Sequence, residues 1–321
     1  MHLRQVKDLP HLCRGFFFAR YHREQHRGRL DFPIHLLIPL GSALLYALGA
    51  LAIKRSNQFG IGLWRISFLA NWAMALCIAP MWFLGGSVPD SAWWQPLVVA
   101  AIFFMAQTFT FLALTKGDVS VAVPILGTKV LLVALFSSVV LAGKVPVTWW
   151  IAAGLSTAGI FFLSRGDVSV RRNAFATAAF AAGAATFFSM NDVLVQKWVP
   201  AWGVGRFLPV MFACLALLSF LYMPMFQASL RQIPKGGRGW VAAGAWLLGI
   251  QATGILFSIG RFGDATAVNI VYSSRGMWSV ILVWLIGHWF LNAEQDLGRS
   301  VLAQRLIGSA FMVLAIVLVM V

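Results

Sequence analysis

The stretch GDVSVAVPILGTK, residues 117–129, recurs in shorter form as GDATAV, residues 263–268. Each copy opens with Gly-Asp, and aspartate favours the N-cap of a helix. Each copy also places one cation eleven residues beyond its aspartate, Lys129 in the first and Arg275 in the second. A lone cation at the centre of a membrane helix costs about 2.5–3.5 kcal/mol on insertion scales. The pattern therefore indicates a duplicated membrane helix with a cation kept at depth in each copy.

The composition excludes an ordinary soluble domain. Of 321 residues, 60% are hydrophobic and 11% are charged, which is typical of a polytopic membrane protein. The three cysteines are isolated, so the sequence predicts neither a metal site nor a cofactor. The net charge of +15 lies largely in a basic tail, residues 1–33, and in short loops. We attribute it to contact with lipid headgroups and expect no nucleic-acid partner.

The predicted fold is all-α, because apolar runs of the length that spans a membrane, roughly 20 residues, follow one another along the chain. Ten such runs follow Asp31, and they are Ile34–Ile53, Leu63–Phe83, Trp93–Leu114, Val119–Leu141, Val147–Leu163, Ala174–Val195, Phe207–Phe226, Trp240–Ile259, Ala265–Leu291 and Leu302–Val321.

The duplication extends over the whole membrane part of the chain. Lys54, at the end of the first run, matches Lys197 at the end of the sixth, and Arg65 matches Arg206 at the start of the second and seventh. Residues 34–164 and 173–321 therefore form two units of five helices. An odd number of helices places the units in opposite orientations, which predicts an inverted repeat. The four cations are expected to be interfacial anchors, with a role as gates as the alternative.

This arrangement resembles the EamA-type drug/metabolite transporter superfamily. The features that carry the resemblance are the five-plus-five helices, Gly-Asp at the start of the fourth helix of each unit, and a basic residue that ends the first helix and begins the second. The resemblance covers nearly all of residues 34–321. It implies a multi-pass protein of the cell inner membrane with both termini in the cytoplasm. The charges of the loops do not independently support that orientation.

Polar side chains at membrane depth must be satisfied within the protein or by water in a cavity. Lys129 and Arg275 are too far from the ends of their helices to reach water easily. Together they would attract a carboxylate or phosphate group, although the alternative is that they pair with an acid and lock helices together. The residues expected to bind a substrate in one central cavity are Lys129, Arg275, Thr128, Tyr272, Ser274, Gln107, Gln251 and Asn191.

Asp192 is the only acid placed well inside a span, so it cannot neutralise both cations. If it pairs with Arg275, Lys129 is available to an anion, and if it is free it could titrate and couple proton movement. Direct contact with substrate is a third role. Pro124 would bend the fourth span, and Gly276 beside Arg275 could loosen the ninth.

The predicted function is that of a carrier, not an enzyme, which moves a small polar metabolite by alternating access. Its expected partners are that substrate and membrane lipid, with proton or counter-substrate coupling and the oligomeric state left open. One alternative is an intramembrane enzyme, since GRFGD, residues 260–264, resembles the motif of membrane aspartyl proteases. That chemistry needs two facing carboxylates. A channel or an assembly scaffold is the other alternative.

Overall fold

The computed structural model describes residues 34–116, 119–141, 144–164, 174–286 and 299–320. Within these ranges nine helices are long and apolar enough to cross a membrane, and Val147–Leu163 is a shorter apolar helix. The prediction of an all-α polytopic membrane protein is therefore confirmed. The basic tail, residues 1–33, and the predicted cap Asp118 lie outside the described residues.

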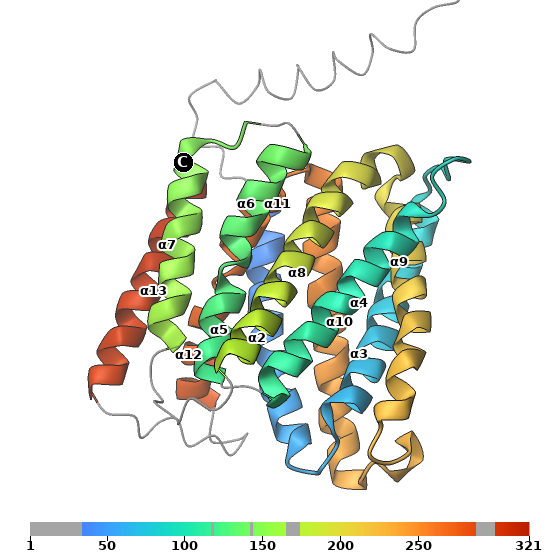
Figure 1. The fold of residues 1–321 in the computed structure, drawn as a ribbon, viewed down its shortest axis with the longest axis horizontal. Coiled ribbons are helices and arrows are strands. Elements are labelled where there is room, and N and C mark those ends of the chain that lie inside the picture. The colour runs from blue at the N-terminus through green and yellow to red at the C-terminus, as the bar shows by residue number, and fades with distance from the viewer. Residues whose placement is uncertain (1–33, 117–118, 142–143, 165–173, 287–298, 321) are drawn as a thin grey trace, which may run out of the picture. The chain divides into compact units, whose positions relative to one another are not determined.

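The helices of the first unit follow the predicted order (Figure 1). They are η1 (Ile34–Leu36) with α2 (Leu37–Asn57), α3 (Leu63–Ile78) continued by η2 (Ala79–Leu84), α4 (Gln95–Lys116), α5 (Val119–Gly127), α6 (Lys129–Val140) and α7 (Val147–Ser164).

The second unit repeats this order, except that η1 occurs only in the first unit and η4 only in the second. Its helices are α8 (Ala174–Trp202), α9 (Val204–Leu218) continued by η3 (Ser219–Met225), η4 (Leu230–Gln232), α10 (Lys235–Phe262), α11 (Ala265–Tyr272), α12 (Arg275–Ile286) and α13 (Arg299–Met320). In both units the second span ends in a 3-10 helix and the fourth span is divided into two helices.

The helices of the two units pack in exchanged pairs. The first helix of each unit lies against the third of the other, α2 on α10 and α8 on α4, while α7 lies beside α13 (Figure 1). Each of these contacts has its counterpart when the units are exchanged, as a two-fold relation requires. Ile34–Met320 forms one compact unit, so both halves share a single core.

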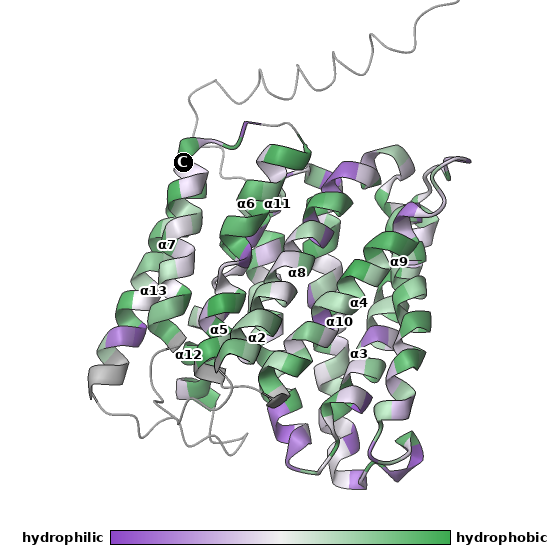
Figure 2. Ribbon diagram, viewed as in Figure 1, coloured by the Kyte–Doolittle hydropathy of each residue, from purple (hydrophilic) through white to green (hydrophobic). Residues whose placement is uncertain are grey.

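The outer surface of the bundle is apolar, as a lipid-facing surface must be. Large hydrophobic side chains are strongly exposed, among them Phe83, Val139, Phe175 and Trp284. In Figure 2 hydrophobic residues dominate the middle of the bundle, and the most hydrophilic residues gather towards the helix ends. The interior contains close helix contacts, since a Cβ atom on Gly159 of α7 would lie 2.8 Å from the carbonyl oxygen of Gly308 on α13.

The helix breaks lie near the predicted bending points but not at them. Pro124 lies inside α5, and the fourth span breaks at Thr128; Gly276 lies inside α12, and the ninth span breaks at Ser273 and Ser274. A hydroxyl group makes a hydrogen bond to the preceding turn at each break. The Thr128 hydroxyl donates to the carbonyl of Ile125 (2.7 Å), and the Ser273 hydroxyl donates to that of Ile270 (2.6 Å). Such side-chain bonds compete with the helical ladder.

Candidate functional site

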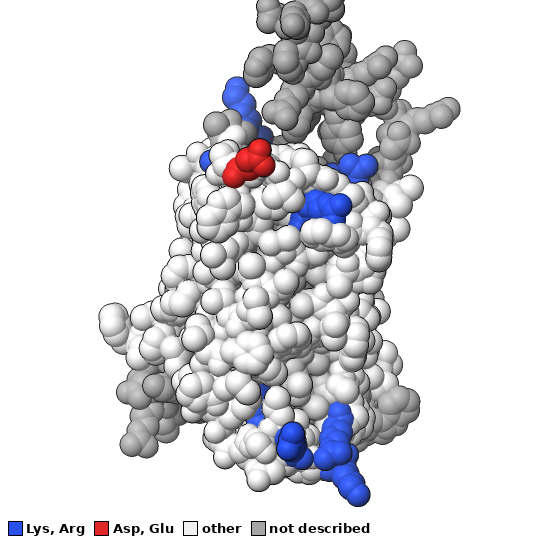
Figure 3. All heavy atoms as spheres, turned by 90° about the vertical axis from the view of Figure 1, so that its right-hand side faces the viewer, with Lys and Arg blue, Asp and Glu red and all other residues white. Residues whose placement is uncertain are grey.

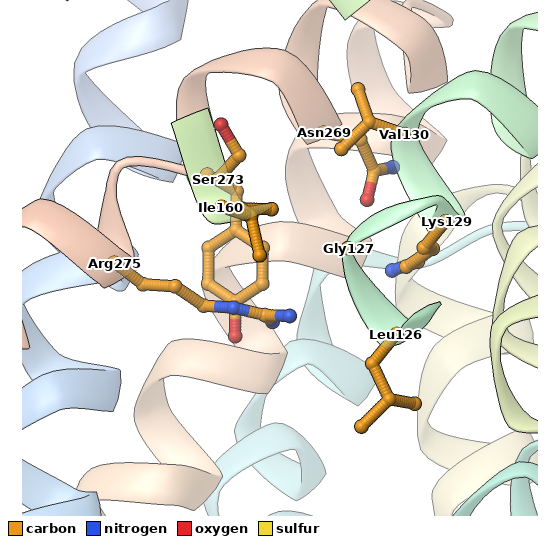
Figure 4. A pocket seen from close by; sticks show the side chains of 9 residues that line it. Leu126, Gly127, Lys129, Val130, Ile160, Asn269, Ser273 and Arg275 are labelled. Carbon is orange, nitrogen blue, oxygen red and sulfur yellow. The ribbon is translucent and has the colours of Figure 1, made fainter. Parts of the chain in front are cut away.

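The two helix breaks place the two buried cations at equivalent positions. Lys129 is the first residue of α6, and Arg275 is the first residue of α12. Their side chains project from opposite sides into the same small cavity (Figure 4). The polar part of its wall is completed by Asn269, Tyr272 and Ser273. Sequence and structure therefore agree that both cations face the protein interior.

The central cavity is nearly closed in this conformation. Its volume is about 10 Å³, which is room for a single water molecule. Apolar side chains close the remainder of its wall, namely Leu126, Val130 and Ile160. A cavity of this volume has no room for a molecule the size of a metabolite.

Asp192 pairs with Lys129 instead of Arg275. Lys129 Nζ lies 2.8 Å from Asp192 Oδ2, and the two side chains are 13% and 3% exposed. The same oxygen accepts a hydrogen bond from Asn269 Nδ2 at 2.8 Å, and Oδ1 accepts one from Asn191 Nδ2 at 3.1 Å. Lys129 Nζ also lies 5.5 Å from the centre of the Phe188 ring. The carboxylate from α8 is thus committed to one lysine and two amides.

Arg275 is held by aromatic rings. Its Cζ atom lies 4.7 Å from the centre of the Tyr272 ring and 4.9 Å from that of Tyr46, within the range of a cation–π interaction. Among the described residues no carboxylate lies within 4 Å of it. Tyr46, on α2, was missed from the sequence, because a single tyrosine in an apolar span is typical of ordinary packing.

Two of the predicted binding residues do not line the cavity but bind residues near it. Gln251 of α10 accepts a hydrogen bond from the Tyr272 hydroxyl at 2.8 Å. Asn191 holds the carboxylate of Asp192. Neither side chain lines the cavity. Gln251 positions Tyr272, which does line it, and Asn191 positions Asp192, the partner of Lys129.

Three other predicted binding residues also lie outside the cavity wall. Thr128 forms the helix break. Ser274 is fully buried, and its hydroxyl has no hydrogen-bond partner among the described residues. Gln107 of α4 donates to Asn71 Oδ1 on α3 at 2.9 Å, so it joins two helices of the first unit.

The four predicted gate or anchor cations divide into two kinds. Lys54 and Lys197 are exposed, and Lys197 lies inside α8 because this helix extends to Trp202. Arg65 is buried and Arg206 is partly buried, each as the third residue of its helix. Both arginines reach a connecting segment of the other unit, Arg65 through Ser229 and Arg206 through the Trp82 ring.

Asp264 does not cap its helix with its side chain. It occupies the N-cap position of α11, but Gln196 of α8 supplies the cap, accepting from the N–H of Ala265 at 2.9 Å and donating to the carbonyl of Gly263. Asp264 Oδ2 lies 3.8 Å from His35 Nε2. The protease alternative would need a carboxylate that faces Asp264, and Asp192 is committed to Lys129 instead.

Comparison with protein families gives a match over the first unit. Residues 33–165 match the model of the EamA-like transporter family. The resemblance found in the sequence is thereby confirmed for the first EamA-like unit, and it supports a membrane transporter of the drug/metabolite type. The protein is an integral, multi-pass membrane protein.

Solved structures show the same fold over most of the chain. Of 29 matching chains, one described as "Crystal structure of protein" aligns with a TM-score of 0.69 at 18% identity, covering 90% of this chain and 96% of its own. At that identity the likeness shows the fold alone, and the alignment reaches beyond residue 165. No curated protein matches the chain.

Proposed function

We propose that the protein is a carrier that moves a small anionic or zwitterionic metabolite by alternating access around the Lys129–Arg275 cavity. The observation that carries this proposal is the charge balance of the described interior. Two cations face one cavity, and the one carboxylate beside them is bound to Lys129. Arg275 therefore keeps an uncompensated positive charge, and its guanidinium group suits the two-point recognition of a carboxylate or phosphate.

The helix breaks favour the same class of cargo. α6 and α12 each begin at the cavity, and the N-terminal end of a helix carries partial positive charge. Half-helices that point their N-termini at a central site are a common way to bind anionic groups in transporters with inverted repeats. The breaks also divide the two spans at the depth where a rocking motion would have to bend them.

Asp192 is the proposed coupling residue. Protonation of its carboxylate would remove the negative charge 2.8 Å from Lys129 and release the lysine to an incoming anion. Proton binding and substrate binding would then favour the same state. We further propose that the carrier lies in the cell inner membrane with both termini in the cytoplasm.

The experiment is a screen followed by transport. Purified protein is screened by thermal shift against amino acids, organic acids, nucleotide sugars and phosphates, and each hit is tested for counterflow in proteoliposomes. Counterflow distinguishes a carrier from a channel, and intact substrate distinguishes it from an enzyme.

Charge variants then test the cavity. Lys129→Gln/Arg275→Gln should lower transport by about a hundredfold or more, because two charge-assisted contacts of about 1.5–3 kcal/mol each are lost. Arg261→Gln, an exposed position at the end of α10, is the matched control and should transport normally. Normal transport by the double variant would remove both cations from the mechanism.

A further inference from the structure

A second, larger pocket lies at the end of the bundle where α2 connects to α3. Its volume is about 480 Å³, and its wall includes Asn57, Trp64, Arg65, Phe226 and Gln227. These residues come from the α2–α3 connection and from the segment that follows η3. We call it the Arg65 pocket. It is large enough for a small metabolite, unlike the central cavity.

Arg65 is a buried charge without a counter-ion among the described residues. It is 4% exposed, Nη2 donates to the carbonyl of Gly60 at 2.8 Å, and Nη1 donates to that of Ser229 at 3.5 Å. Its Nε is buried and has no partner in the described part of the chain. A buried guanidinium held only by neutral carbonyls is poorly compensated.

The surroundings of the pocket are basic. On the face shown in Figure 3, Lys and Arg lie at both the upper and the lower edge, whereas acidic side chains appear at the upper edge alone. The described acids number three, Asp90, Asp192 and Asp264, and none of them lines the pocket. Further cations stand on the same connections, namely Lys54, Arg55, Arg231, Lys235 and Arg238. Clustered cations of this kind raise the local concentration of anions.

The arginine of the other unit that corresponds to Arg65 has a different environment. Arg206 corresponds to Arg65, and its Cζ atom lies 3.9 Å from the centre of the Trp82 ring. In the repeat, Trp82 corresponds to Phe226, because each lies two residues beyond the matching prolines, 80 and 224. Phe226 lines the Arg65 pocket, yet within the described residues no ring stacks on Arg65. The corresponding arginine is stacked on a ring at one end of the bundle and borders a pocket at the other.

At the end of the bundle where Arg206 lies, hydrogen bonds to the backbone also join the two units. Ser87, which follows η2, donates from its N–H to the carbonyl of Trp202 at 2.9 Å and from its hydroxyl to that of Ala201 at 3.0 Å. The corresponding segment at the other end, after Phe226, instead borders the 480 Å³ pocket. The two ends thus differ although their sequences are repeats.

We propose that the Arg65 pocket binds the carboxylate or phosphate group of a small ligand, with Arg65 as its charged partner and Trp64 and Phe226 against the apolar part. Asn57 and Gln227 supply neutral amide groups in the same wall. The pocket is an outer site for the same chemical class as the central cavity, and in this respect the inference rests on the proposed function. A free metabolite and a phospholipid headgroup share this chemistry.

The test is a binding titration of the full-length protein in phosphate-free detergent, with inorganic phosphate and benzoate as probes. It is made in the Lys129→Gln/Arg275→Gln background, so that only the outer site contributes. Arg65→Gln should weaken binding by about tenfold or more, because a charge-assisted contact is lost. Gln227→Glu keeps Arg65 in place but adds a carboxylate to the pocket wall, so it should weaken binding as well. It serves as the second test if Arg65→Gln does not fold.

Arg231→Gln is the matched control, since it removes the same charge from an exposed position at the same end. Equal loss of binding in Arg65→Gln and Arg231→Gln, or full binding in both Arg65→Gln and Gln227→Glu, would overturn the proposal. The titration is repeated in nanodiscs of phosphatidylcholine and of phosphatidylglycerol. Probe binding that only the anionic lipid abolishes assigns the site to a headgroup, and binding retained in both assigns it to a free anion. The site is tested by binding alone, so its outcome does not depend on transport.

Discussion

Replacing Asp192 by Asn should destabilise the protein more than any other single change of a described acid. The substitution leaves Lys129 charged and mostly buried, at 13% exposure, with no carboxylate beside it. At 2.8 Å the direct attraction in this pair is about 6 kcal/mol at an effective dielectric constant of about 20. Part of this is offset by desolvation, and breaking a buried pair by removing one partner costs about 3–5 kcal/mol.

The two single variants of the pair should not be equal. When Lys129→Met removes the cation, Asp192 still accepts hydrogen bonds from Asn191 and Asn269, each contributing about 1.5–3 kcal/mol to a charged group. When Asp192→Asn removes the acid, the amide oxygen that replaces the carboxylate carries no charge, and among the described residues Lys129 otherwise has the Phe188 ring at 5.5 Å. We therefore expect the loss of the acid to cost more. The double variant should recover most of the stability, since neither charge is then left alone.

The assay is equilibrium unfolding in mixed micelles, followed by circular dichroism as the denaturing detergent is increased. The matched control is Asp90→Asn, an exposed acid between α3 and α4, which should change the free energy of unfolding by no more than about 0.5 kcal/mol. The reasoning is refuted if Asp192→Asn is as stable as Asp90→Asn. It is refuted equally if the double variant is as unstable as Asp192→Asn.

Other contacts give further predictions. Gly159→Leu should lower the free energy of unfolding by about 1–3 kcal/mol, because its Cβ would lie 2.8 Å from a backbone carbonyl of α13. Gly154→Leu is the control and should not lower it, because nothing lies within 4 Å of a Cβ at that position. Thermal unfolding compares the two variants. Gln196→Ala removes the cap of α11, costs about 1 kcal/mol and should speed hydrogen exchange at its first turn. Tyr272→Phe keeps the ring beside Arg275, whereas Tyr272→Leu loses about 0.5–2 kcal/mol of cation–π attraction. The KM for transport should therefore rise less in Tyr272→Phe than in Tyr272→Leu.

The sequence predicts the architecture because membrane spans and repeats are encoded locally. The run of apolar residues gives each span, and the repeated Gly-Asp and the cation eleven residues later give the register of the two units. That register is what the structure shows, with Lys129 and Arg275 each opening the second half of a broken span. Burial of both cations could be predicted because neither lies near an end of its predicted span.

The partners of these cations could not be predicted, because they come from other helices. Asp192 belongs to α8, which packs on α5 and α6, whereas Tyr46 belongs to α2, which packs on α11 and α12. Helix packing of this kind decides which acid meets which cation, and a single sequence does not display it. The break at Thr128 was missed for a different reason, since a hydroxyl bond to the preceding turn is weaker as a sequence signal than a proline.

The two cations have different partners, an acid beside Lys129 and an aromatic ring beside Arg275. α2 and α8 are equivalent helices, and each meets the cation of the opposite unit, but α8 presents the carboxylate of Asp192 and α2 presents the ring of Tyr46. A carboxylate cancels the charge of its partner, whereas a ring attracts a cation and leaves its charge in place. The duplicated backbone thus carries one neutralised and one retained charge. A strictly symmetric site with two carboxylates would have no reason to attract an anion, so Tyr46→Asp should lower the affinity for an anionic substrate in counterflow while Tyr46→Phe preserves it.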